Sequence, residues 1–138
     1  MDSQEKVIIA SGPVIIEDGK LLVIKEDKDD FYKLPGGRVE EKDTDLEKTC
    51  RREFKEEVDG ELEIIKPLHP ILVRQNQSTG EKMTIILIHY LCKLKNKFHI
   101  RPILPIKELK WLDISEIIKG KYHVATNIKF LIAKGDIK

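Results

Sequence analysis

A single amphipathic segment, residues 45–58, limits the folds open to this chain, because it is flanked on both sides by short apolar runs. Its apolar residues recur every four positions and form one helical stripe: Leu46, Cys50, Phe54 and Val58. Thr44 and Glu47 predict a capping box at its start. Asp59-Gly60 predicts its end, with glycine as the left-handed residue. The sequence therefore predicts one well-defined helix among strands.

Short apolar runs separated by turn residues predict the strands. Asp18-Gly19 between two β-branched runs predicts a type I′ hairpin, because both central residues of that turn need positive φ. A strand at residues 31–34 is expected to stop at Pro35. We expect further strands at 62–65, 71–74, 83–94 and 109–112, a hairpin turn at 75–82, and helices at 116–119 and around 124–132. This order predicts an α+β sandwich, a mixed sheet flanked by helices, as one domain over residues 1–138.

Composition excludes several classes of protein. The 138 residues carry 25 Lys+Arg and 24 Asp+Glu, and this balance argues against dedicated nucleic-acid binding. The longest charge-free stretches, 7–16 and 83–92, have ten residues, whereas a membrane helix needs about 20. Residues 1–6 lack the pattern of a secretory signal, and Cys50 and Cys92 form no CxxC motif. We therefore expect a cytoplasmic protein without a membrane span.

Three carboxylates within the predicted helix suggest a metal site. Glu53, Glu56 and Glu57 are spaced i, i+3 and i+4, so they share one side of the helix and border its apolar stripe. Like charges at this spacing repel, and a cation among the oxygens relieves that cost. Hard oxygen ligands without His or Cys favour Mg²⁺, with Mn²⁺ as the second choice. The alternative is a solvated acidic face of an interaction protein.

The turn at residues 35–37 makes the metal site more specific. Gly36 and Gly37 follow a proline, and adjacent glycines allow the backbone, including a carbonyl oxygen, to approach a metal or phosphate. The acidic run at 40–45 is expected to be a solvated loop near this site. None of the four histidines shows ligand spacing, and His89 lies within an apolar strand. We therefore expect no histidine ligand.

The stretch 36–60 resembles the signature of the Nudix hydrolases, of the MutT-like kind. That signature reads Gly, five residues, Glu, seven residues, Arg-Glu, apolar, any, Glu-Glu, any, Gly, apolar. Residues 52–57, Arg-Glu-Phe-Lys-Glu-Glu, match its centre in full. The loop after Gly37 has one extra residue, so Asp43 or Thr44 stands at the first acidic position, and Asp59 stands where the signature has glycine.

The resemblance implies roles for the metal-binding residues. Glu53, Glu56 and Glu57 would hold one or more divalent cations, together with the carbonyl of Gly36. Glu53 would orient or deprotonate the attacking water. Arg52 would pair with a glutamate of the signature and fix its rotamer.

Residues outside that centre receive roles by the same resemblance. Glu108 is either a further ligand or base, or an exposed carboxylate at a strand end. Gly37, Arg38 and Arg74 would contact substrate phosphates, and an ordinary surface role is the alternative for the two arginines.

The implied activity is that of a nucleotide pyrophosphohydrolase. With Mg²⁺ it would cleave a pyrophosphate bond in a nucleoside diphosphate linked to another group, such as a nucleoside triphosphate. The implied partner is a small-molecule nucleotide, and a homodimer is open. The alternative function is a nucleotide-binding or regulatory module of the same fold with weak or no catalysis.

Overall fold

The computed structural model describes residues 6–138, so residues 1–5 of the segment considered for a secretory signal lie outside it. The strands form one mixed sheet in the order β4-β6-β1-β2-β7, with β3 paired to β1 and β5 paired to β6. The elements are β1 (Val7–Glu17), β2 (Lys20–Glu26), β3 (Gly37–Arg38), α1 (Leu46–Val58), β4 (Leu62–Pro67), β5 (Ile71–Gln75), β6 (Lys82–Leu94), β7 (Ile106–Asp113), α2 (Ile114–Ile118) and α3 (Thr126–Ala133).

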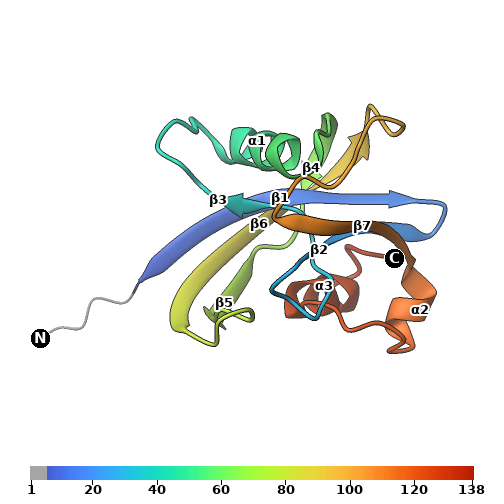
Figure 1. Ribbon diagram of the computed structural model, residues 1–138. Helices are drawn as coiled ribbons and strands as arrows, with labels where there is room; N and C mark the ends of the chain where they lie inside the picture. The colour runs from blue at the N-terminus through green and yellow to red at the C-terminus, as the bar shows by residue number, and fades with distance from the viewer. Residues whose placement is uncertain (1–5) are drawn as a thin grey trace, which may run out of the picture.

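Helices cover both faces of this sheet. Helix α1 lies over one face, and α2 and α3 lie against the other (Figure 1). Each face has its own apolar core, and successive residues of β1 contribute to opposite cores, Val14 to one and Ile15 to the other. This confirms the expected sandwich. No helix within residues 6–138 has the length and apolarity that a membrane crossing requires.

Strand β1 runs through the centre of the sheet and sets the register around it. It pairs in parallel with β6 and antiparallel with β2. The apolar runs at residues 7–9 and 14–16 both belong to this one continuous strand. Asp18 and Gly19 have φ of 52° and 73° between the paired residues Glu17 and Lys20, which confirms the predicted hairpin. The hairpin between β5 and β6 is confirmed as well.

Both predicted caps of α1 need correction. The helix is capped by Asp45, whose side chain accepts a hydrogen bond from the N–H of Lys48 at 2.8 Å, so the predicted Thr44–Glu47 capping box is wrong. At the other end Asp59, with φ of 58°, is the left-handed residue. Gly60 is required for space instead, because a Cβ there would lie 2.0 Å from the ring of Phe54.

The predicted strand at 31–34 is wrong, because this segment makes only two isolated bridges. Tyr32 pairs with Val124, and Lys33 pairs with Ile24. The two residues therefore bond to different neighbours, and Pro35 prevents the ladder from continuing. In contrast, β7 extends beyond the expected residues on both sides, and Asp113 at its end caps α2 by accepting from the N–H of Ser115.

Candidate active site

The glycine turn at residues 36–37 is held against β1 by direct backbone contact. Gly36 has φ of 144°, and a Cβ on it would lie 2.6 Å from the carbonyl oxygen of Ser11. A Cβ on Gly12 would lie 1.9 Å from the carbonyl oxygen of Pro35. Neither position has room for a side chain, so the two glycines fix the turn at the centre of the sheet.

The turn contacts two of the predicted glutamates. The N–H of Gly36 donates to Oε1 of Glu57 at 2.9 Å. A Cβ at position 37 would lie 2.3 Å from the carboxyl carbon of Glu53, so that carboxylate rests against Gly37. The paired glycines therefore bring the backbone of the turn to the acidic side of α1.

Arg52 organises the charges around these glutamates. Its Nε donates to Oδ1 of Asp43 and its Nη2 donates to Oδ2 of Asp43, both at 2.9 Å. Nη2 also donates to the carbonyl oxygen of Arg38 at 2.9 Å. This two-point pair orients the guanidinium and holds the pKa of the Asp43 carboxyl far below its usual range. The guanidinium of Arg52 therefore ties α1 to the loop that precedes it.

The expectation of a solvated loop at 40–45 is wrong for Asp43. Its side chain is 3% exposed, and besides Arg52 it accepts hydrogen bonds from the N–H of Glu40 and the hydroxyl of Thr49, both at 2.9 Å. Asp43 thus provides the carboxylate for the arginine that precedes Glu53, despite the extra residue in the loop. Sequence spacing left Asp43 and Thr44 as alternatives, and the contacts select Asp43.

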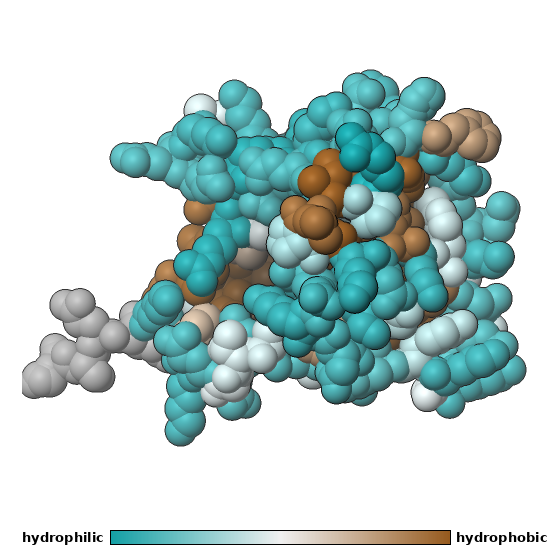
Figure 2. All heavy atoms as spheres, viewed as in Figure 1, coloured by the Kyte–Doolittle hydropathy of each residue, from teal (hydrophilic) through white to brown (hydrophobic). Residues whose placement is uncertain are grey.

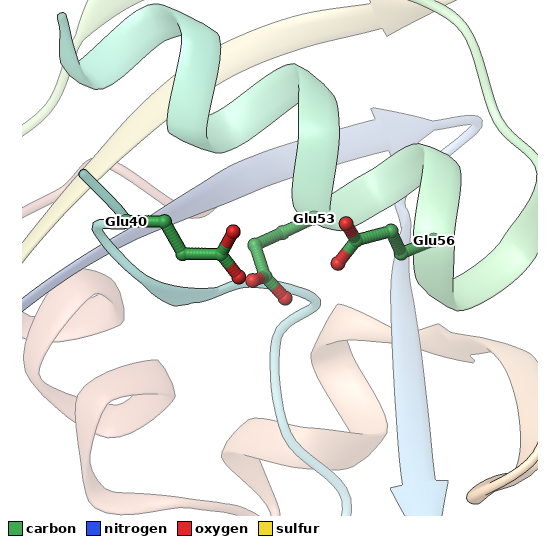
Figure 3. A group of neighbouring side chains, drawn as sticks. All are labelled: Glu40, Glu53 and Glu56. Carbon is green, nitrogen blue, oxygen red and sulfur yellow. The ribbon is translucent and has the colours of Figure 1, made fainter. Parts of the chain in front are cut away.

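Three carboxylates gather beside this arginine. Oxygens of Glu40, Glu53 and Glu56 all lie within 4.8 Å of one another, and Figure 3 shows the loop residue Glu40 meeting the two helix residues. Nη1 of Arg52 lies 3.2 Å, 2.8 Å and 3.1 Å from Glu40, Glu53 and Glu56. Because Asp43 already neutralises Arg52, these three carboxylates keep a surplus of negative charge. Such a donor set fits a hard divalent cation.

The pKa directions agree with crowded acids. Burial is the main reason that the pKa of Glu53 is raised, and the charges of Glu56 and Glu40 add to it while Arg52 opposes it. Burial also raises the pKa of Glu57 to about 8, against the hydrogen bond from Gly36. A divalent cation beside these carboxyls favours their charged forms. Glu57 lies outside the cluster of Glu40, Glu53 and Glu56 that Figure 3 shows, and its carboxyl group is buried more deeply than that of Glu53.

Glu108 lies in a different environment. Its Oε1 accepts from the hydroxyl of Tyr32 at 3.0 Å, and its carboxylate is 3.6 Å from Nζ of Lys25 and 3.3 Å from Nζ of Lys110. The Tyr32 hydrogen bond is the main reason that its pKa is lowered. Two lysines therefore neutralise Glu108, and it does not join the carboxylate cluster.

The two expected phosphate-binding arginines are positioned differently. Arg38 is exposed next to Gly37, and its carbonyl holds Arg52. Arg74 on β5 donates from Nη1 to the hydroxyl of Thr84 at 2.7 Å. Of these two, Arg38 is the one that follows the glycine turn directly.

A cavity of about 190 Å³ opens beside the glycine turn, between the sheet and the start of α3. The turn forms one wall and the residues after β5 another, while Phe31, Leu87 and His89 contribute ring and apolar surface. On the face shown in Figure 2, hydrophobic residues are visible in a recess framed by hydrophilic ones. Sequence reasoning missed this cavity because its lining comes from five separate segments.

Comparisons with known proteins concern the family and the fold of the chain. The family model of the NUDIX domain matches residues 7–132. No curated protein matches the chain.

Solved structures share its fold at low identity. A MutT protein from Methanosarcina mazei Go1 is 16% identical with a TM-score of 0.79, over 98% of this chain and 96% of that one. A NUDIX hydrolase from Nitrosomonas europaea is 19% identical with a TM-score of 0.75, over 93% and 87%. A MutT NUDIX hydrolase from Burkholderia pseudomallei is 23% identical with a TM-score of 0.68, over 80% and 86%.

Proposed function

Because this chain belongs to the Nudix family of pyrophosphate-cleaving hydrolases, we propose that its substrate is a nucleoside diphosphate linked to another group, such as a nucleoside triphosphate, and that it requires Mg²⁺. The observation that carries this proposal is the cluster of Glu40, Glu53 and Glu56 beside the glycine turn. Bound Mg²⁺ would neutralise charge on the pyrophosphate oxygens.

The proposed cation ligands are Glu53 and Glu56, with Glu40 added from the loop. Their oxygens converge within 4.8 Å, a geometry that supports this assignment. Glu57 is the fourth acidic residue of the proposed site, and its Oε1 accepts a hydrogen bond from the N–H of Gly36. Because that N–H faces Glu57, the Gly36 carbonyl is kept as a proposed ligand only on the family resemblance.

We assign proton transfer from the attacking water to the carboxylate of Glu53. Its side chain is 15% exposed, so water reaches it. Its pKa is raised toward neutral pH, which is the direction that favours a general base. Arg52 keeps this carboxylate in place with a 2.8 Å hydrogen bond. The other residues of the site are proposed to bind and orient the substrate and the water.

The proposed substrate contacts use the turn and its neighbours. Gly37, beside Glu53, allows a phosphate to approach the backbone, and the exposed side chain of Arg38 supplies a positive charge next to it. Arg74 is less suited than Arg38 to bind a substrate phosphate, because its guanidinium donates a hydrogen bond to Thr84. Glu108, paired with two lysines, is not proposed as a ligand.

We also propose a cytoplasmic location. Both cysteines, Cys50 and Cys92, are buried free thiols, which fits a reducing compartment. A homodimer stays a prediction.

Incubation of the purified protein with Mg²⁺ and a panel of nucleotides tests the hydrolysis. We expect release of phosphate, pyrophosphate or nucleoside monophosphate, and a fall of roughly 10²- to 10⁴-fold in Glu53→Gln. Glu63→Gln on β4 is the matched control, because Glu63 is an exposed residue outside the cluster. Nucleotide binding without release across the whole panel would instead favour the regulatory module.

A further inference from the structure

A second cavity, of about 330 Å³, lies between α1, the segment that begins β4 and the connection between β6 and β7. Its α1 side includes Arg51 and Lys55, which are spaced i, i+4 and therefore share one flank of the helix. At about 100° per residue, Glu53 lies about 200° around the helix from each of them. The cavity is therefore on the other flank of α1 from that glutamate.

Basic side chains predominate in the lining of this cavity. Arg51, Lys55 and Lys95 line it, and among the described residues Glu61 is the one carboxylate of the lining. Arg52 also borders the cavity, but its guanidinium is already paired with carboxylates on the catalytic side of the helix. The remaining three cations outnumber the single carboxylate.

Two of these cations are available to a ligand. Neither Arg51 nor Lys95 forms an ion pair within residues 6–138, whereas Lys55 is paired with Asp59 at 2.8 Å. Nη1 of Arg51 donates to the carbonyl oxygen of Leu62. This bond orients the guanidinium, and its other N–H groups are left for a ligand.

Hydrogen bonds hold the loop of Lys95 beside α1. The N–H of Lys95 donates to the carbonyl oxygen of Glu61 at 2.9 Å, and the N–H of Glu61 donates to Oδ1 of Asn96 at 2.8 Å. Further along, the N–H of Arg101 donates to the carbonyl oxygen of Val58 at 3.0 Å, so the connection runs past the end of α1 (Figure 1). The backbone of the site is therefore set before a ligand binds, which lowers the entropic cost of binding.

The charge and the size of the cavity indicate a ligand that carries a phosphate group. An arginine fork and an ammonium group from a second element match the several oxygens of a phosphate. The volume of about 330 Å³ is at the lower end of the roughly 300–1,000 Å³ of small-molecule pockets, so there is room for a phosphate and part of the molecule that bears it.

The loop itself favours anions although the whole chain is nearly neutral. Residues 93–101 contain four Lys+Arg and no Asp+Glu. Phe98, three residues after Lys95, is 94% exposed, and the turn that carries it is closed by a hydrogen bond of 2.9 Å from the N–H of His99 to the carbonyl oxygen of Asn96. Cations next to an exposed aromatic ring are the combination by which proteins bind single-stranded nucleic acid.

We propose that Arg51, Lys55 and Lys95 form a second anion-binding site, outside the catalytic centre, for the phosphate group of a small anion or of a single-stranded nucleic acid. This site needs no divalent cation, because its positive charges come from side chains. All three side chains are exposed, so salt screens them and the affinity falls as ionic strength rises.

Titration with inorganic pyrophosphate in EDTA at low salt tests the site, because the carboxylate cluster without a divalent cation repels anions. We expect amide NMR shifts at residues 51–62 and 95–101. Calorimetry should show roughly threefold to tenfold weaker binding in Lys95→Gln and in Arg51→Gln. Lys119→Gln is the matched control, because Lys119 is an exposed lysine at the end of α2, on the other face of the sheet.

A decanucleotide of thymidine distinguishes the two sources of the phosphate. If a nucleic-acid strand is the ligand, Phe98→Ala should weaken decanucleotide binding about fivefold or more and leave pyrophosphate binding unchanged. If the ligand is a small anion, Phe98→Ala should bind both probes as the wild type does, and Lys95→Gln should still weaken pyrophosphate binding. Either result supports the site.

Melting temperatures show whether each variant folds. Arg51→Gln removes the hydrogen bond to Leu62, whereas the side chain of Lys95 makes no hydrogen bond within the described residues, so Lys95→Gln keeps the test decisive. Equal pyrophosphate affinity in folded Lys95→Gln and wild type would overturn the inference. So would shifts confined to the glycine turn, or no binding of either probe. None of these measurements needs turnover, so they do not depend on the proposed hydrolysis.

Discussion

Gly12→Ala is expected to displace the glycine turn from the proposed catalytic carboxylates. The new Cβ would lie 1.9 Å from the carbonyl oxygen of Pro35 and 2.6 Å from Cα of Gly36. Ordinary contact begins at 3.4 Å, so relief requires the strand and the turn to separate by about 1.5 Å, the difference between 3.4 and 1.9 Å. Both obstructing atoms belong to the backbone, and no rotamer change can remove the clash.

The separation has two measurable consequences. Overpacking of this kind costs about 1–3 kcal/mol of stability. The turn also carries the N–H that holds Glu57 and the surface on which Glu53 rests, so both carboxylates lose their support. A misplacement of about 1 Å can lower activity by about 10²-fold, and we expect a loss of kcat/KM of that order.

Denaturant unfolding and steady-state hydrolysis of the best nucleotide measure these effects. Gly120→Ala is the control, because Gly120 has φ of 82° with open space around the position of a Cβ. That substitution costs about 1–2 kcal/mol through backbone strain and leaves the turn untouched. A folded Gly12→Ala with the kcat/KM of wild type would refute the reasoning, and so would an equal loss of activity in Gly120→Ala.

Three further predictions concern the metal, the core and the pH dependence. Glu40→Gln should weaken the rise in melting temperature on Mg²⁺ titration, with roughly tenfold lower affinity, whereas Glu41→Gln from the same exposed loop should keep it. Gly60→Ala should cost about 1–3 kcal/mol in denaturant unfolding, because its Cβ would lie 2.0 Å from the buried ring of Phe54. His89 has a folded pKa of about 4 against roughly 6.5 unfolded, so the unfolded chain takes up its proton first as pH falls. Between pH 7 and 5 the wild type should therefore lose about 2 kcal/mol more stability than His89→Leu, and equal losses would contradict a neutral buried imidazole.

Local patterns determined the elements that depend on local physics. The stripe from Leu46 to Val58 predicted α1 because apolar residues four apart must share one helical face. Asp18-Gly19 predicted the hairpin because its backbone angles are set within the turn. The caps of α1 were misassigned, since Thr44 and Asp45 both suit a cap and Asp59 and Gly60 both tolerate left-handed angles.

The sequence by itself placed the proposed site residues Arg52, Glu53, Glu56 and Glu57 on one helix, because their spacing falls within a single amphipathic segment. Only the tertiary structure decided their partners. Asp43 pairs with Arg52, and Glu40 lies beside Glu53 and Glu56, because the loop before α1 folds against the helix. The length of that loop does not indicate which of its residues reach the helix. Likewise His89 and Asn127, far apart in the chain, meet at one cavity only when α3 packs on the sheet. Contacts between distant segments depend on the packing of whole elements, and no local pattern encodes them.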